Sequence, residues 1–154
     1  MCDLHLKPIN SINCGIGGDR TQHVLWRAEH LSLPDYVGVV VLLCGTNNIK
    51  HDLPHDIAHG VISCGTRLKE KHPHLTVIVV GILPRDGPTS KRRSKIQQTN
   101  DVLKMVCWNQ GFLYIEQACH WTTSSGELNQ SLYWKDNLHL SKNCLLYTSD
   151  AADE

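Results

Sequence analysis

Residues 37–44 form the longest apolar stretch of the chain, Val-Gly-Val-Val-Val-Leu-Leu-Cys, and no polar residue interrupts it. A strand with this pattern is usually covered on both faces, as in a parallel sheet that lies between layers of helices. Residues 75–83 repeat the pattern with Leu-Thr-Val-Ile-Val-Val-Gly-Ile-Leu. Both stretches are far shorter than the ~20 residues that a membrane-spanning helix requires. They predict two buried strands of an α/β fold.

Helical patterns alternate with these strands. Apolar residues recur at intervals of three or four in three stretches, residues 19–31, 54–71 and 91–110. Asp19 is expected to cap the first helix, and Pro54 to open the second. Shorter strands are expected at residues 9–14 and 112–118. The resulting order of strand and helix predicts a parallel sheet with right-handed crossovers.

Composition limits the class of protein. The chain has 154 residues, the size of one domain, and 15 basic residues balance 15 acidic ones. This balance argues against general binding of nucleic acid or acidic membranes, so a small molecule is the expected partner. Seven cysteines are spread along the chain without a Cys-x-x-Cys pair, and no apolar signal segment follows Met1. We therefore expect reduced thiols and a cytoplasmic protein.

Three short polar segments stand where apolar strands end or helices begin. They are Gly-Ile-Gly-Gly-Asp at residues 15–19, Gly-Thr-Asn-Asn at 45–48 and Asp-Asn-Leu-His at 136–139. In a parallel sheet such segments can meet at one edge, which is the usual place for a site. The glycines can present backbone N–H groups to an anion, and Asn47 can add an amide N–H. Asp136 can orient His139 as a general base.

Each segment also has a simpler interpretation. The glycines suit a tight turn, Asn47 suits an Asx turn, and an Asp-x-x-His sequence occurs often by chance. The glycine cluster lacks the third glycine of a dinucleotide-binding fingerprint and the Gly-Lys-Ser/Thr of a P-loop. An oxyanion-binding turn therefore fits better than a phosphate cradle.

Three other groups of residues have competing interpretations. His51, His55 and His59 recur every four residues, a spacing that can chelate zinc, but no further ligand is evident, so we expect a solvated face and no metal. Residues 91–93, Lys-Arg-Arg, form either a solvated face or a weak anion contact. Trp26 and Trp134 can line a pocket, although the position of Trp26 is more typical of a core residue.

The three segments resemble blocks II, III and V of the SGNH (GDSL-type) hydrolases. Residues 13–27, Asn-Cys-Gly-Ile-Gly-Gly-Asp-Arg-Thr-Gln-His-Val-Leu-Trp-Arg, are most similar to the subfamily of intracellular platelet-activating-factor acetylhydrolase catalytic subunits, and the resemblance extends over residues 9–142. It implies a flavodoxin-like three-layer α/β/α sandwich. It also implies that Gly18 and Asn47 donate to the oxyanion, and that Asp136 and His139 belong to a Ser-His-Asp triad. No cofactor is implied.

The chain departs from the family pattern at both ends. The family nucleophile is the serine of a Gly-Asp-Ser motif upstream of the block II glycines, and the 154 residues contain no such motif. Ser11 lies within a predicted strand and is rejected as a substitute. We expect a partial SGNH domain at residues 1–143, without the first strand and the closing helix, and a disordered tail of foreign sequence at residues 144–154.

Two classes of function follow from this. The first is a serine esterase domain that hydrolyses a short-acyl, acetyl-like ester of a small molecule or lipid, with its nucleophile outside this chain. The second is a catalytically inactive binding or assembly module, for example within a larger mobile-element protein. A homo-oligomer is compatible with either class.

Overall fold

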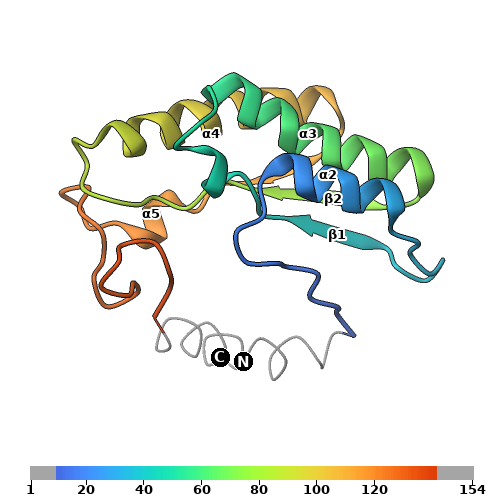
Figure 1. The fold of residues 1–154 in the computed structure, drawn as a ribbon, viewed down its shortest axis with the longest axis horizontal. Helices are drawn as coiled ribbons and strands as arrows, with labels where there is room; N and C mark the ends of the chain where they lie inside the picture. The colour runs from blue at the N-terminus through green and yellow to red at the C-terminus, as the bar shows by residue number, and fades with distance from the viewer. Residues whose placement is uncertain (1–9, 142–154) are drawn as a thin grey trace.

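The computed structural model describes residues 10–141, which form a small α/β domain (Figure 1). Its elements, in chain order, are α2 (Thr21–His30), β1 (Val39–Leu42), the short 3-10 helix η2 (Thr46–Asn48), α3 (Pro54–Lys71), β2 (Thr76–Val80), α4 (Lys91–Asn109), β3 (Leu113–Ile115) and α5 (Ala118–Trp121).

The three strands form one parallel sheet in the order β1-β2-β3. Val41 of β1 is level with Ile78 of β2, which is level with Leu113 of β3. The predicted parallel sheet is therefore confirmed, and its strands are shorter than the apolar stretches that predicted them. All three carboxyl ends lie at the same edge, and the polar segment at residues 45–48 follows β1 there.

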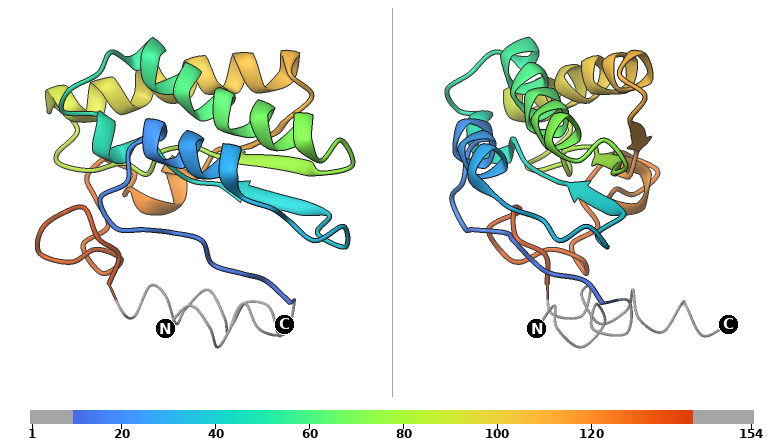
Figure 2. Two further views of the ribbon diagram at one scale, coloured as in Figure 1. Left: turned by 45° about the vertical axis from the view of Figure 1, so that its right-hand side comes forward. Right: turned by 90° about the vertical axis from the view of Figure 1, so that its right-hand side faces the viewer.

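The helices α2, α3 and α4 pack beside one another on one face of the sheet (Figure 2). Val77 and Val79 of β2 and Leu103 of α4 are almost completely buried between these two layers. The bounds predicted for α3 and α4 agree closely with the structure, because Pro54 begins one helix and Ser90 caps the other by accepting a hydrogen bond from the N–H of Arg93.

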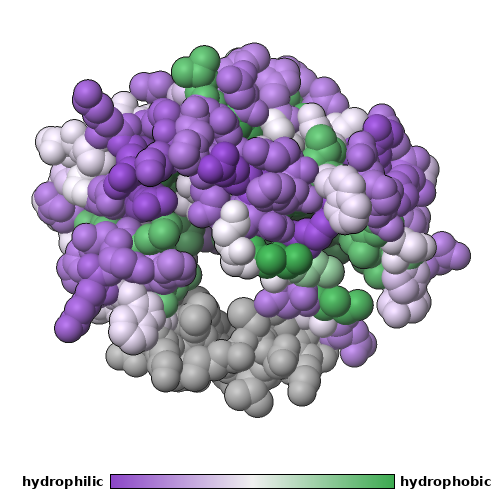
Figure 3. Space-filling model, viewed as in Figure 1, coloured by the Kyte–Doolittle hydropathy of each residue, from purple (hydrophilic) through white to green (hydrophobic). Residues whose placement is uncertain are grey.

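The opposite face of the sheet is open, so the prediction that β1 is covered on both faces is wrong for the described residues. Val41 is 60% exposed and Leu113 is 56% exposed, and Val39 and Ile115 beside them are also exposed. In Figure 3 polar residues dominate the helical side, while apolar residues gather along the lower side of the body. Within residues 10–141 no long helix covers this face, and the second helical layer of the expected sandwich is not found there.

Two local predictions near the start of the chain are also wrong. The described part of the strand expected at residues 9–14 has no strand partner and runs as exposed, irregular backbone. Asp19 does not cap α2; its carboxylate accepts a hydrogen bond from the Arg27 guanidinium at 2.5 Å. The α2 cap is Arg20, whose backbone N–H donates to Nδ1 of His23 at 3.2 Å.

None of the helices described for this chain is long and apolar enough to cross a membrane. The tail predicted at residues 144–154 lies outside the described residues.

Candidate active site

The loop that follows β1 is fixed by a glycine and an asparagine. Gly45 has φ +106°, and a Cβ there would lie 2.9 Å from side-chain carbons of Ile57 and Ile82, so only glycine fits. The chain can then turn sharply into η2. This turn places Asn47 and Asn48 at the carboxyl end of β1, as the sequence predicted.

Asn47 joins the two segments that were predicted to bind an oxyanion. Its side-chain amide donates a hydrogen bond of 2.8 Å to the backbone carbonyl of Asp19, the residue after Gly18. An asparagine amide has two hydrogens, so one remains for a ligand. Gly18 has φ +82°, and its backbone N–H has no hydrogen-bond partner among residues 10–141. The structure therefore brings Gly18 and Asn47 together and leaves each with a donor.

Asn48 is a site residue whose role the sequence did not reveal. It is 1% exposed, and its Oδ1 accepts a hydrogen bond of 3.0 Å from the backbone N–H of Thr21, the first residue of α2. Its amide donates to Oδ2 of Asp52 at 2.6 Å and to Oε1 of Gln22 at 3.1 Å. Asn48 thereby fixes the start of α2 against the β1 loop, which holds the Gly18 turn in place.

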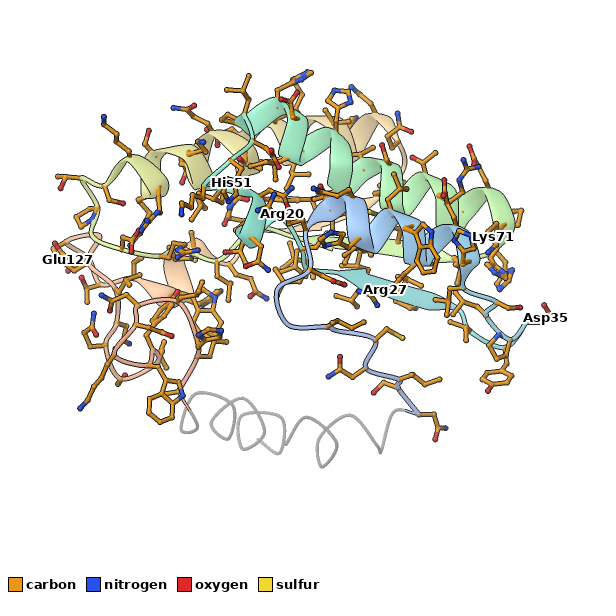
Figure 4. All side chains as sticks on the ribbon, in the orientation of Figure 1. Arg20, Arg27, Asp35, His51, Lys71 and Glu127 are labelled. Atoms are coloured by element: carbon orange, nitrogen blue, oxygen red, sulfur yellow. The ribbon has the colours of Figure 1, made fainter. Side chains whose placement is uncertain are left out.

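Arg27, in the last turn of α2, supports the same turn. Its guanidinium donates to the backbone carbonyl of Cys14 and to Asp19, both at 2.5 Å. Figure 4 shows Arg27 extending from α2 toward the N-terminal segment. An arginine and an aspartate eight residues apart carry no local sequence signal, so only the fold reveals this pair.

Asp136 and His139 form the expected pair. Oδ2 of Asp136 lies 2.6 Å from Nδ1 of His139, and Oδ1 accepts hydrogen bonds from the backbone N–H groups of Leu138 and His139 at 3.1 and 3.0 Å. These hydrogen bonds, that of the imidazole first, lower the pKa of Asp136 to about 2. The carboxylate is thus ionised at neutral pH and can hold the imidazole in one orientation.

The loop that carries this pair is anchored by Tyr133. The Tyr133 side chain is buried, and its hydroxyl donates a hydrogen bond of 2.7 Å to the carbonyl of Pro84, a few residues beyond β2. The pair therefore lies at the same edge of the sheet as the β1 loop. No hydrogen bond or ion pair within residues 10–141 joins Asp136 or His139 to Gly18 or Asn47, so the structure forms two half-sites.

Two surface pockets adjoin the half-sites. Trp134, Lys135, Asp136 and His139 line an open pocket of about 370 Å³. A second pocket of about 240 Å³ is lined by Asp19, His23, Trp26 and Arg27. Trp26 is 60% exposed and stacks on His30, so the prediction that it is a core residue is wrong.

The described residues offer no serine to His139. No serine hydroxyl between residues 10 and 141 makes a hydrogen bond with Nε2 of the imidazole, although Ser131 and Ser141 are close in sequence and are hydrogen-bonded to other groups. The absence of a nucleophile from this chain stays a prediction, as do the catalytic roles of Asp136, His139, Gly18 and Asn47.

Two of the three histidines on α3, and the two arginines of residues 91–93, contact other groups of the chain. His55 and His59 pack with ring centroids 4.2 Å apart, and no group of three potential metal ligands occurs among residues 10–141. Arg92 pairs with Asp86 at 3.2 Å, and Arg93 donates to the carbonyls of Arg85 and Asp86. The basic first turn of α4 thus holds the loop after β2 in place.

The parallel sheet, the glycine turn, the asparagine loop and the Asp-His pair together define a GDSL-type hydrolase fold. The chain belongs to the GDSL-like lipase/acylhydrolase family, whose sequence model matches residues 3–143.

Its curated relatives include the human platelet-activating factor acetylhydrolase IB subunit alpha1. This relative is 37% identical over 99 residues, which are 64% of this chain and 42% of the human protein. The Drosophila melanogaster subunit beta homolog is 35% identical over 101 residues, which are 64% of this chain and 44% of that protein. The matches thus cover less than half the length of these curated relatives.

Solved structures show the same fold. A GDSL-like lipase from Bacteroides thetaiotaomicron superimposes with a TM-score of 0.78 at 17% identity, covering 97% of this chain and 77% of that one. An acetylxylan esterase from Geobacillus stearothermophilus gives a TM-score of 0.72 at 17% identity, covering 92% of this chain and 69% of that one. At these identities the likeness shows the fold alone.

Proposed function

We propose that these residues form the acid-base and oxyanion-binding part of a serine esterase that hydrolyses a short-acyl, acetyl-like ester. The observation that carries the proposal is the 2.6 Å contact between Oδ2 of Asp136 and Nδ1 of His139. This contact favours one tautomer, with the proton on Nδ1, and leaves Nε2 to accept a proton from a nucleophile. The names of the acetylhydrolase and acetylxylan esterase relatives support an acetyl-like group.

In the proposed reaction a serine hydroxyl attacks the ester carbonyl while Nε2 of His139 takes its proton. The N–H of Gly18 and the free amide hydrogen of Asn47 bind the oxyanion, and His139 then protonates the departing alcohol. Water attacks the acyl-serine by the same route and releases the acid. The serine belongs to a Gly-Asp-Ser segment outside these 154 residues, which also supplies elements of a three-layer sandwich.

The substrate is a small-molecule or lipid ester that binds beside Trp134 in the open pocket. No cofactor takes part, since the proton transfers and the oxyanion are served by the residues named above. The seven dispersed cysteines, of which the five in the described residues are free thiols, support a cytoplasmic location.

The test uses a longer form of the protein that contains Gly-Asp-Ser upstream of residue 1. It should hydrolyse p-nitrophenyl acetate, and His139→Ala should lower kcat/KM by roughly 10³-fold or more. His55→Ala is the matched control, because His55 is an exposed histidine on α3 that is not part of the site. Full activity of His139→Ala in this form would refute the mechanism.

The alternative is a catalytically inactive binding or assembly module. The open apolar face around Val41 and Leu113 favours it, since exposed apolar surface of this kind usually marks an interaction site. A longer form that assembles, as measured by light scattering, but hydrolyses no ester would support this second function. A homo-oligomer with esterase activity would support the first.

A further inference from the structure

Asn100 of α4 holds the chain at Ile82, just beyond the end of β2. Its side-chain amide donates a hydrogen bond of 2.9 Å to the Ile82 carbonyl, and its Oδ1 accepts one of 2.9 Å from the Ile82 backbone N–H. Both residues are 2% exposed. β1 does not reach Ile82, because its last residue, Leu42, is level with Val79. A carboxamide has the donor and acceptor of a peptide group, so Asn100 takes the place of a strand partner.

The side chain of Ile82 packs against the oxyanion half-site, which is the β1 loop with Asn47 and the turn at Gly18. Ile82 belongs to a buried cluster that includes Ile49, the residue directly after η2. A Cβ on Gly45, at the start of the same loop, would lie 2.9 Å from Cδ1 of Ile82. Ile82 therefore supports the oxyanion loop from beneath, close to both of its ends.

The same stretch of chain holds the Asp-His half-site. The carbonyl of Pro84 accepts the 2.7 Å hydrogen bond from the Tyr133 hydroxyl. The next residue, Trp134, donates its backbone N–H to the carbonyl of His139 at 2.7 Å. Residues 82–84, which we call the linking segment, therefore pack against the oxyanion half-site at one end and hold the Asp-His half-site at the other.

We propose that Asn100 is a positioning residue that sets the spacing between the two half-sites through the linking segment. The inference rests on the proposed function, in which a serine and an ester must meet both half-sites at once. Without the Asn100 carboxamide Ile82 loses its two hydrogen bonds, and Pro84 and the loop held by it move relative to the β1 loop. A misplacement of about 1 Å between reacting groups can lower the rate by about 10²-fold.

Thr99 provides a matched control on the same helix. Its side chain is completely buried, and its hydroxyl donates a hydrogen bond of 2.8 Å to the carbonyl of Lys95 within α4. Thr99→Ala thus removes a buried polar group next to Asn100 without removing a hydrogen bond to the linking segment. A change caused only by weaker packing of α4 should occur in this variant as well.

The experiment measures the distance between the half-sites in this chain by double electron–electron resonance. Nitroxide labels on ketone-bearing non-natural residues at positions 50 and 135 avoid the seven cysteines. Lys50 and Lys135 are both exposed, the first shortly after η2 and the second beside Asp136. The chain without further changes should give one narrow distance distribution. Asn100→Ser should shift and broaden this distribution, and Thr99→Ala should leave it as it is.

A second label pair shows where the change arises. His59 is exposed on α3, so labels at positions 50 and 59 report on the oxyanion side of the domain alone. Their distance should be the same in Asn100→Ser as in the parent. A change in this distance, with no change between positions 50 and 135, would overturn the proposal.

Tyr133→Phe tests the other end of the linking segment and decides the matter if Asn100→Ser fails to fold. It removes only the hydroxyl that is bonded to Pro84. The distribution between positions 50 and 135 should broaden in this variant too. A distribution equal to that of the parent in Tyr133→Phe, or an equal change in Thr99→Ala, would overturn the proposal.

Kinetics of the longer form that contains Gly-Asp-Ser separate this inference from the proposed function. Asn100→Ser should lower kcat for p-nitrophenyl acetate by about 10²-fold with little change in KM. The pH profile should stay the same, because Asp136 and His139 are paired within their own loop. A longer form without esterase activity would refute the proposed function, and the distances in this chain would still decide the spacing. An active longer form in which Asn100→Ser keeps the parental kcat would overturn the positioning role alone.

Discussion

Asn48→Ala is expected to destabilise the domain strongly, because this buried side chain connects three segments. The substitution leaves the backbone N–H of Thr21 without its acceptor at a position that is 5% exposed. An unsatisfied buried donor costs about 1–3 kcal/mol, and each further hydrogen bond lost contributes about 1 kcal/mol. Water can replace Asn48 at the partly exposed carboxylate of Asp52. The free energy of unfolding should therefore fall by about 3 kcal/mol, with a decrease in Tm of about 10 °C.

The neighbouring Asn47→Ala provides a matched control. Asn47 is the same residue type one position earlier, but it is only half-buried and makes one hydrogen bond, to the carbonyl of Asp19. Its loss should cost about 1 kcal/mol. Urea unfolding followed by circular dichroism measures both variants, with the slope against denaturant as a check that the transition is unchanged. Equal effects, or a larger one for Asn47→Ala, would refute the reasoning.

Asn48→Asp tests the electrostatic part of the same argument. The carboxylate keeps an acceptor for Thr21 but faces Oδ2 of Asp52, which now lies 2.6 Å from the amide nitrogen. Burial and this second carboxylate raise the folded pKa of the introduced group above its unfolded value. Its contribution to stability is then greatest at low pH and is lost as pH rises through the raised value. A variant that becomes more stable as pH rises above 4 relative to the parent would contradict this.

Three further predictions concern other parts of the domain. The Asp136 carboxyl should titrate near pH 2 by NMR, and at a higher pH in His139→Ala. Because its folded pKa is depressed, the stability that it contributes should be lost as pH falls from about 4 toward 2. An unchanged Asp136 titration in His139→Ala would contradict the pairing. Val79→Thr, on the buried face, should cost about 1–3 kcal/mol, while Val41→Thr, on the open face, should cost less than about 0.5 kcal/mol and raise solubility, both measured by urea unfolding and sedimentation. Gly45→Ala should reduce Tm markedly in a thermal melt, because its Cβ would collide with two isoleucine side chains; a Tm equal to that of the parent would disprove the close approach.

The sequence predicted the elements whose signals are local. Pro54 occurs at the observed start of α3, the helical spacing of apolar residues at 91–110 matches α4, and the continuous apolar runs contain β1 and β2. The prediction that β1 is buried on both faces was less successful. The apolar pattern of residues 37–44 shows that both faces of this strand can be buried, but it does not show which elements lie against them. The strand expected at residues 9–14 fails for a related reason, because a strand requires a hydrogen-bonding partner along its edge.

The site shows the same division between local and long-range information. The pairing of Asp136 with His139 could be predicted because three residues separate them. The contact of Asn47 with Asp19 spans 28 positions and depends on the parallel order of the sheet. Asp19 was assigned to a helix cap, where its carboxylate is common, but the tertiary structure gives it to Arg27. The sequence does not distinguish the buried Asn48 from its neighbour Asn47. The two differ in the direction in which the 3-10 helix η2 points each side chain.

The hydrogen bonds that orient the Asp136 carboxylate and the His139 ring all lie within four consecutive residues. Such a unit is portable, since its geometry depends on the short loop rather than on the sheet beneath it. A gene that loses its nucleophile can keep this pair intact through many substitutions elsewhere, and a designer can graft it onto another scaffold by copying one turn. The presence of the pair is therefore better evidence for the origin of the loop than for ester hydrolysis by the protein that carries it.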